Sequence, residues 1–302
     1  MSTLVSSVAA TVNRIFASLT NTRLGYIYTY LSPDNLELPE AFVDNAVLAS
    51  QGPGIKAVVV THDANITVSG IQRLKGYAAK GLPIILSGGS AQYYPISNDG
   101  GIDAFKAGLQ ELANLKGVHT TASGNIAKAL ASHGVSPRVR VQTNSTWNMT
   151  WREDKEARVD YAFVFSDGGG SQGEITTTTD KFPHLFDAWT GQRQPVVQYN
   201  RQAGDLVIPL TLKANQTAIL AFSAQPLDGI YTPPVHVESA PNSVLGYQVD
   251  YKSGAVAQLV HTANESSDEL ILSDNSTRTV PDTSAIPVSF PIRNWTLTAE
   301  RW

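Results

Sequence analysis

Four acidic residues, the residue type that cleaves sugar bonds in glycosidases, lie close together near the middle of the chain. They are Glu153, Asp154, Glu156 and Asp160. Glycoside hydrolysis needs two carboxyl groups held about 5–9 Å apart across the scissile bond. These four residues follow Trp151, and the local pattern predicts a loop that leads into a strand. We therefore interpret them as solvated loop residues, and the catalytic residues stay unknown.

A second candidate for chemistry is Gly88-Gly89-Ser90, which follows an apolar run typical of a strand. Glycine-rich loops in this position can cradle phosphate groups. Here, however, neither the full dinucleotide fingerprint nor a Walker lysine is present, and Ser90 lacks the Gly-x-Ser-x-Gly context of a nucleophile elbow. A tight turn is the favoured interpretation. A small enzyme with a site around Ser87 to Ser90, at the strand ends of an α/β domain, stays open as an alternative.

His184 and Asp187 form a third candidate pair. Three residues apart in an extended segment, they would point to opposite faces, so we predict a structural turn pinned by Trp189 and Gly191 instead. The histidines as a group show no metal-ligand spacing; they are His62, His119, His133, His184, His236 and His261. The chain has no cysteine, which excludes thiol nucleophiles and Cys-ligated zinc. We predict no metal and no cofactor.

Seven Asn-x-Ser/Thr sequons occur, none with proline in the middle. Their asparagines are Asn65, Asn144, Asn148, Asn215, Asn264, Asn275 and Asn294. An N-linked glycan is bulky and solvated, so each occupied asparagine must lie on the surface. The favoured interpretation is a secreted, extracellular glycoprotein, and the alternative is a β surface that is simply rich in Thr and Asn.

Composition excludes several other classes of protein. Charged residues make up 16% of the chain and the net charge is -4, so there is no basic surface for nucleic acid. No run of 18 apolar residues occurs, so we expect no membrane partner. At 302 residues the chain has room for two domains, each with its own core.

Residues 1–22 carry apolar side chains at helical spacing, beginning at Leu4, and predict an amphipathic helix. Arg14 interrupts any hydrophobic region, so no signal peptide is visible. A glycoprotein without an export signal suggests that the chain is part of a longer one.

Residues 23–136 alternate between β-rich runs and helix-period stretches. This alternation predicts parallel βαβ units in a three-layer α/β domain. The run Ile55-Lys-Ala-Val-Val-Val-Thr is typical of a strand buried on both faces. The predicted helices cover residues 40–49, 68–80, 102–115 and 125–133.

Beyond Val135-Ser-Pro the sequence becomes Thr-rich, with short alternating strands separated by turn signals. Residues 137–290 therefore predict an antiparallel β-sandwich. Residues 291–302 look like the start of a truncated further β domain.

Two sets of segments resemble a known family. The first set is Leu24-Gly-Tyr-Ile-Tyr-Thr-Tyr, Ile55-Lys-Ala-Val-Val-Val and Gly81-Leu-Pro-Ile-Ile-Leu-Ser-Gly-Gly. The second is Trp151-Arg-Glu-Asp, Asp160-Tyr-Ala-Phe-Val-Phe, Phe186-Asp-Ala-Trp-Thr-Gly and Ile208-Pro-Leu-Thr-Leu. Together they resemble the region after the catalytic barrel in α-L-rhamnosidase-like glycoside hydrolases of family 106, particularly large secreted fungal members.

The resemblance implies a flavodoxin-like parallel α/β domain followed by an antiparallel β-sandwich. It implies an upstream catalytic barrel as a partner if the chain is a fragment. That barrel has no counterpart in this sequence, so no catalytic residue is carried over.

Three hypotheses about function follow. The first is a non-catalytic accessory region of a secreted rhamnosidase-like hydrolase that acts on plant or microbial polysaccharide. The second is a stand-alone carbohydrate-binding or structural glycoprotein, in which Trp147, Trp151, Tyr93 and Tyr94 are candidates for stacking on sugars. For the two tryptophans, burial in the sandwich core is the favoured alternative. The third is the small α/β enzyme described above.

Overall fold

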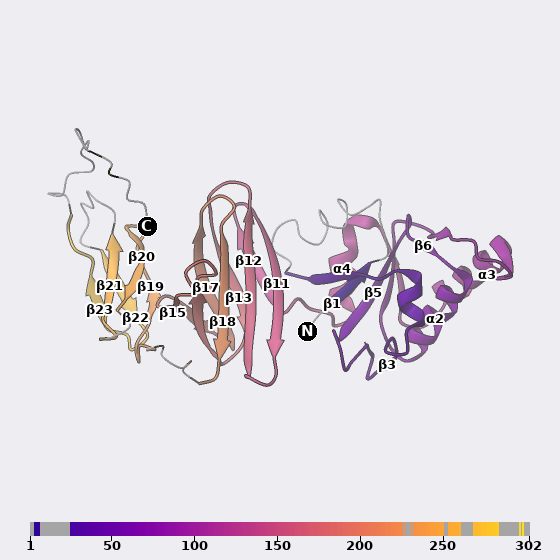
Figure 1. Ribbon diagram of the computed structural model, residues 1–302, viewed down its shortest axis with the longest axis horizontal. Helices are drawn as coiled ribbons and strands as arrows, with labels where there is room; N and C mark the ends of the chain where they lie inside the picture. Colours follow the sequence, from indigo (N-terminus) through magenta and orange to yellow (C-terminus); the bar gives the residue numbers. More distant parts are fainter. Residues whose placement is uncertain are drawn as a thin grey trace. The chain divides into compact units, whose positions relative to one another are not determined.

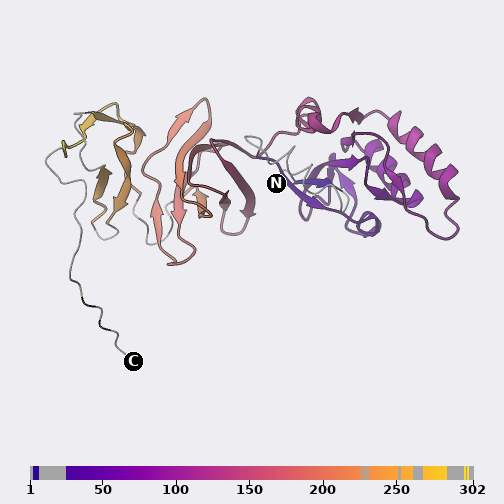
Figure 2. The same cartoon turned by 90° about the horizontal axis from the view of Figure 1, so that it is seen from above.

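The computed structural model describes residues 3–6, 25–225, 227, 230, 232–250, 253–260, 268–283, 296 and 298. The chain divides into two compact units: unit 1 is Met1–Gln192 with Arg201–Gln225, and unit 2 is Arg193–Asn200 with Pro226–Trp302. Unit 1 contains an α/β part and a sandwich part, which Figures 1 and 2 colour from indigo to orange. None of the described helices is long and apolar enough to cross a membrane.

A parallel sheet forms the centre of the α/β part. Its strands are β1 (Thr3–Ser6), β2 (Ile27–Tyr30), β5 (Ile55–Thr61), β7 (Ile84–Ser87) and β9 (Val118–Thr121). They lie in the order β2-β1-β5-β7-β9, and every neighbouring pair is parallel. In chain order this is the 2-1-3-4-5 arrangement of flavodoxin-like sheets. The segment between β1 and β2 lies outside the described residues, so the flavodoxin-like prediction is confirmed only in part.

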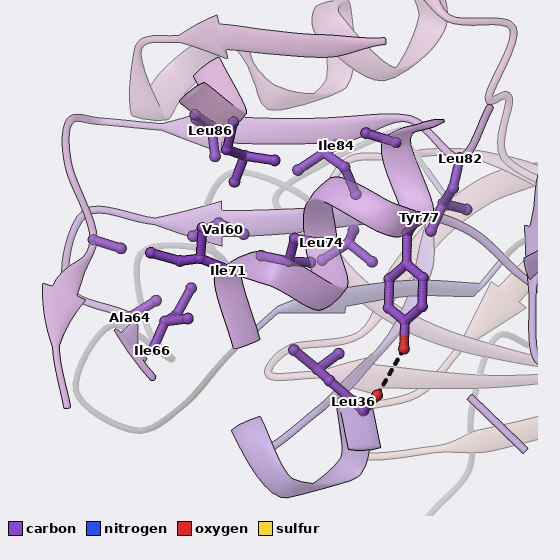
Figure 3. Close-up of a cluster of buried hydrophobic side chains, with 14 of the residues drawn as sticks. Leu36, Val60, Ala64, Ile66, Ile71, Leu74, Tyr77, Leu82, Ile84 and Leu86 are labelled. Carbon is purple, nitrogen blue, oxygen red and sulfur yellow. Dashed lines mark hydrogen bonds between the residues drawn. The ribbon is translucent and has the colours of Figure 1, made fainter. Parts of the chain in front are cut away.

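Helices cover both faces of this sheet, as the three-layer prediction requires. The helices α2 (Val68–Ala79) and α3 (Gly101–Ala113) lie on one face, and α4 (Ile126–Ser132) lies on the other. Figure 3 shows the first of these cores, where Ile71 and Leu74 of α2 pack against sheet residues such as Val60. Alternate residues of β5 enter the two cores, so the strand is buried on both faces.

Two predicted helices are wrong. Thr3–Ser6 form β1, because their backbone completes hydrogen-bonded ladders with β2 and β5 on either side; the rest of the predicted helix over 1–22 lies outside the described residues. Within 40–49, β3 (Val43–Asp44) and β4 (Val47–Leu48) form a hairpin. Its turn residues Asn45 and Ala46 have φ angles of 48° and 60°, which a helix does not allow.

Short elements complete the α/β part. They are the 3₁₀ helices η1 (Pro33–Glu37) and η2 (Ser123–Asn125), and the paired strands β6 (Asn65–Ile66) and β8 (Gln92–Tyr93).

Two antiparallel sheets form the sandwich part. The first contains β10 (Val139–Thr143), β13 (Ser171–Thr178) and β17 (Asp205–Leu212), in that order. The second has the order β11 (Thr146–Asp154), β12 (Val159–Asp167), β18 (Thr217–Ser223) and β14 (Phe182–Phe186). Trp147 Nε1 on β11 donates a hydrogen bond of 2.8 Å to Ser171 Oγ on β13, so these inner faces meet. The predicted antiparallel sandwich is confirmed for these strands.

Unit 2 is built from short strands. They are β19 (Val237–Ser239), β20 (Val244–Val249), β21 (Val256–Val260), β22 (Glu269–Leu272) and β23 (Thr277–Thr279). β15 (Arg193–Pro195) and β16 (Asn200–Gln202) fall where the chain changes from one unit to the other. A small core of Val197, Val237, Leu270 and Val280 stabilises unit 2. The predicted sandwich range of 137–290 thus includes strands of both units, and the predicted further domain lies outside the described residues except for 296 and 298.

Candidate functional site

A cavity of about 600 Å³ lies in unit 1 beside strands β2 and β11. Most of its lining comes from residues 27–55, and Thr150 and Arg152 of β11 complete it. Its walls are largely apolar, with Leu31, Leu38 and Leu48 among them. A volume of this size is typical of sites for small ligands.

Tyr77 fixes the segment that forms one wall of this cavity. Its hydroxyl lies 2.8 Å from the carbonyl oxygen of Leu36 and 2.7 Å from that of Ala41. Burial raises the pKa of Tyr77, so the phenol stays protonated and can donate at neutral pH. At the N-terminus of η1, Ser32 N donates to Asn35 Oδ1 at 3.0 Å and caps the turn.

The walls of the cavity also carry polar side chains. Asn35, Glu40 and Arg152 are among its lining residues, and they can exchange hydrogen bonds with a ligand's hydroxyl groups. Of the described residues that line it, Glu40 is the only acid. A glycosidase needs two carboxyl groups across the bond that it cleaves, and this cavity presents one.

The strand ends of the α/β part bring several small polar residues together. Ser87 and Thr61 are register partners on neighbouring strands, and both are buried. Gly88 follows with φ 78°; a Cβ atom there would lie 2.3 Å from Ser123 Oγ and 3.1 Å from His62 Nδ1. Ser123 and His62 can shift away from a side chain here, but the positive φ of Gly88 favours glycine, as in a tight turn. Ser90 is exposed, and within the described part of the chain no hydrogen bond joins it to a histidine.

Asp160 does not match its prediction as a solvated loop residue. It lies on β12, is 7% exposed, and accepts a hydrogen bond of 2.8 Å from Lys181 Nζ. Arg138 Nη2 lies 3.9 Å from Asp160 Oδ2 and 3.9 Å from Glu153 Oε1, and the guanidinium also lies 5.3 Å from the centre of the Trp151 ring. The charges of Asp160 and Glu153 are thus balanced by cations, because the alternation of β11 and β12 turns both side chains toward Arg138.

Asp154 and Glu156 are exposed, as the sequence predicted. Asp154 Oδ1 accepts hydrogen bonds from the backbone nitrogens of Glu156 at 3.1 Å and Ala157 at 2.9 Å. This carboxylate therefore holds the turn between β11 and β12. In the residues that the structure describes, no cluster of three acids or histidines could hold a metal ion.

His184 and Asp187 belong to different environments. His184 is 0% exposed on β14, and burial lowers its pKa, although the backbone groups of Ala221 and Phe182 oppose that effect. Asp187 is exposed in the turn after β14, where hydrogen bonds from the backbone nitrogens of Trp189 and Thr190 lower the pKa of its carboxyl. That they form no acid–base pair stays a prediction.

The predicted turn is present, but Trp189 does not pin it. The indole is 94% exposed, and Asp187 holds the turn through its carboxylate and backbone. The sequence signal that was missed is the Asp-x-x-Thr-Gly spacing: an aspartate can accept hydrogen bonds from the backbone N–H groups that follow it, so this turn needs no packed tryptophan to hold it.

The predicted stacking residues separate into two groups. Trp147 is 4% exposed and Trp151 is 0% exposed, so neither presents a face to a sugar. The favoured burial in the sandwich core is confirmed for both, and the stacking alternative is wrong. Both project into the sandwich core because they alternate with outward residues on β11, and Trp151 stacks on Phe222 at 5.3 Å. Tyr93 is partly buried and donates a hydrogen bond of 2.7 Å to Asp99. Tyr94 is 54% exposed and stays a candidate.

The described sequon asparagines lie at or near the surface. Asn65, Asn144, Asn215 and Asn275 are exposed and Asn148 is partly buried, whereas Asn264 and Asn294 lie outside the described residues. Glycosylation of these positions stays a prediction.

No family model matches the sequence, and no curated protein matches it. Among solved structures, a rhamnosidase from Novosphingobium sp. PP1Y is similar with a TM-score of 0.58 and 16% identity, over 88% of this chain and 27% of that one. An apo exo-carrageenase from Bacteroides ovatus has a TM-score of 0.42 and 13% identity, over 74% of this chain and 29% of that one. A beta-galactosidase from Bacillus circulans sp. alkalophilus has a TM-score of 0.41 and 12% identity, over 73% and 41%.

Only the rhamnosidase has a TM-score above 0.5 among these three, and the chain spans about a quarter of its length. At 16% identity the likeness shows the fold. The chain therefore shares its fold with one part of that rhamnosidase.

Proposed function

We propose that this chain is a non-catalytic accessory region of a secreted, rhamnosidase-like glycoside hydrolase that acts on plant or microbial polysaccharide. One observation carries the proposal: 88% of the chain shares its fold with 27% of a rhamnosidase. The resemblance to the fungal type of family 106, the flavodoxin-like character of the α/β part and an upstream catalytic barrel as partner all belong to the same proposal.

Two acids of the sandwich part, Asp160 and Asp205, have contacts that support a structural role. Asp160 is paired with Lys181, Asp205 with Arg140 and Thr178. Hydrogen bonds from Thr178 and Arg140 lower the pKa of Asp205, as expected for a carboxylate that is fixed in its ionised form. A general acid for glycoside hydrolysis needs the opposite, a raised pKa.

Hydrolysis by the purified chain is the direct test. The chain would be expressed alone and incubated with p-nitrophenyl α-L-rhamnoside and with soluble rhamnogalacturonan, and reducing ends would be measured over many hours. We expect the rate of the buffer control. Release of sugar that persists through repurification, at a rate proportional to the concentration of the chain, would overturn the non-catalytic assignment.

A stand-alone carbohydrate-binding protein is the second candidate, and the exposed Tyr94 and the 600 Å³ cavity favour it. The two candidates differ in the partner that they require. An accessory region should be encoded in one reading frame with a barrel, and intact mass of the native protein should show one long polypeptide. A secreted native protein with the mass of this chain and its glycans would favour the second candidate.

A further inference from the structure

The turn after β14 is held by a dense set of backbone hydrogen bonds. Asp187 Oδ1 accepts from Trp189 N at 2.8 Å and from Thr190 N at 3.2 Å. Asp187 N donates to Gln192 O at 2.8 Å, and Gly191 N donates to Asp187 O at 2.9 Å. Gly191 has φ 69°, a conformation that favours glycine. The turn is therefore fixed by its own backbone.

Trp189 contributes its backbone nitrogen to this network, while its side chain is 94% exposed. A tryptophan buries about 150–250 Å² when it packs, and covering apolar surface is favourable in proportion to its area. The fixed turn holds Cα and Cβ in place, so a ligand that covers the ring has little backbone entropy to oppose it.

The surroundings of the ring indicate what kind of ligand fits. The exposed neighbours in the turn are Asp187, Thr190 and Gln192, which offer carboxylate, hydroxyl and amide groups, together with the small residues Ala188 and Gly191. Within residues 187–192 the indole is the one large apolar side chain, and the residues beside it in sequence are polar or small. The core of a protein interface needs a wider cluster of apolar side chains. One sugar ring has an apolar C–H face of about the size of an indole, and its hydroxyl groups can reach a polar rim.

We propose that Trp189 is a carbohydrate-binding platform, on which one sugar ring of a polysaccharide stacks while the polar residues of the turn meet its hydroxyl groups. The choice of a polysaccharide as the ligand rests on the proposed function, and the proposal adds a residue that would bind it. The site differs from the sequence candidates Trp147 and Trp151, which the sandwich core covers.

Affinity electrophoresis tests the proposal. The whole chain would run in native gels that contain soluble rhamnogalacturonan, arabinogalactan or xyloglucan, with dextran as a size control. Three variants would run beside it: Trp189→Ala, Trp189→Phe, and Ile102→Ala, which removes another exposed apolar side chain, 44% exposed on α3. Thermal unfolding of each variant would check the fold.

We expect one of the plant polysaccharides to retard the wild-type chain. Trp189→Ala should weaken binding about tenfold, the effect of roughly 1.4 kcal/mol, with an unchanged melting temperature. Trp189→Phe should keep binding within about threefold, because the smaller ring still offers a flat face. Ile102→Ala should bind as the wild type does.

Three results would overturn the platform. Trp189→Ala could bind as well as the wild type, the wild-type chain could bind none of the three polysaccharides, or sedimentation could show a dimer that Trp189→Ala abolishes, which would make the ring a contact between copies. The hydrolysis assay is independent of all three. A chain that cleaves sugars and also needs Trp189 for binding would refute the non-catalytic assignment while leaving the platform intact.

Discussion

Removing the charge of Asp160 tests whether the acids of the sandwich are structural. Asp160→Asn keeps the size of the side chain and removes the partner of Lys181, whose Nζ lies 2.8 Å from Asp160 Oδ2. A hydrogen bond between charged groups contributes about 1.5–3 kcal/mol. The side chain of Asp160 is 10% exposed, whereas those of Lys181 and Arg138 are 21% and 38% exposed. Both cations can therefore recover some hydration, and we expect a loss of about 2 kcal/mol rather than the 3–5 kcal/mol of a fully buried pair.

In a unit of about 200 residues, a loss of about 2 kcal/mol lowers the melting temperature by roughly 4–8 °C. Near-ultraviolet circular dichroism would follow the environment of Trp151 during unfolding, because Arg138 links the pair to that ring. A double-mutant cycle of Asp160→Asn with Lys181→Met should give a coupling of about 1–2 kcal/mol. If Asp160→Asn unfolds at the wild-type temperature, or the coupling is zero, the structural role assigned to this acid is wrong.

Three further predictions concern the two parts of unit 1. Trp151→Ala removes a ring that is 0% exposed and stacked on Phe222, so urea unfolding should show a loss of about 3–5 kcal/mol. Burial lowers the pKa of His184 below 6.5, so the stability that comes from its neutral form is fully present above pH 6.5. The free energy of unfolding should fall as the pH drops from 6.5 toward the pKa in the folded state, by up to about 1.4 kcal/mol per pH unit. His184→Gln should flatten this part of a stability–pH curve. Gly88→Ala forces a side chain into a position with φ 78° and should cost about 1–2 kcal/mol in urea unfolding.

The sequence predicted strands correctly where one local pattern, an apolar run or a strict alternation, was strong. The apolar run of Ile55–Thr61 identified β5, and the alternation near Val159 and Leu206 identified antiparallel strands. It failed where tertiary pairing decided the outcome: Leu4 lies in a strand because β2 and β5 pair with it from both sides. Local periodicity does not contain such pairings between distant segments.

The candidate site was harder to predict than the fold, because exposure depends on the face of an element. Trp151 and Trp189 are the same residue type, yet one is fully buried and the other 94% exposed. On β11 the period of two directs Trp151 into the sandwich. In the turn, the hydrogen bonds of Asp187 hold the backbone without the indole of Trp189, which stays exposed. Whether a tryptophan is exposed therefore depends on the element that carries it, and the residue type alone does not predict it.

The hydrogen bonds and ion pairs of Asp187 and Asp160 differ from those expected of a catalytic acid. A carboxylate that accepts hydrogen bonds from backbone N–H groups, as Asp187 does, has a lowered pKa and is poorly suited to donate a proton to a leaving group. A carboxylate paired with lysine, such as Asp160, is held in place by its partner. What the turn leaves available to a ligand is the apolar face of Trp189. A structural aspartate and an exposed indole in one turn are the two features on which the proposed sugar platform rests.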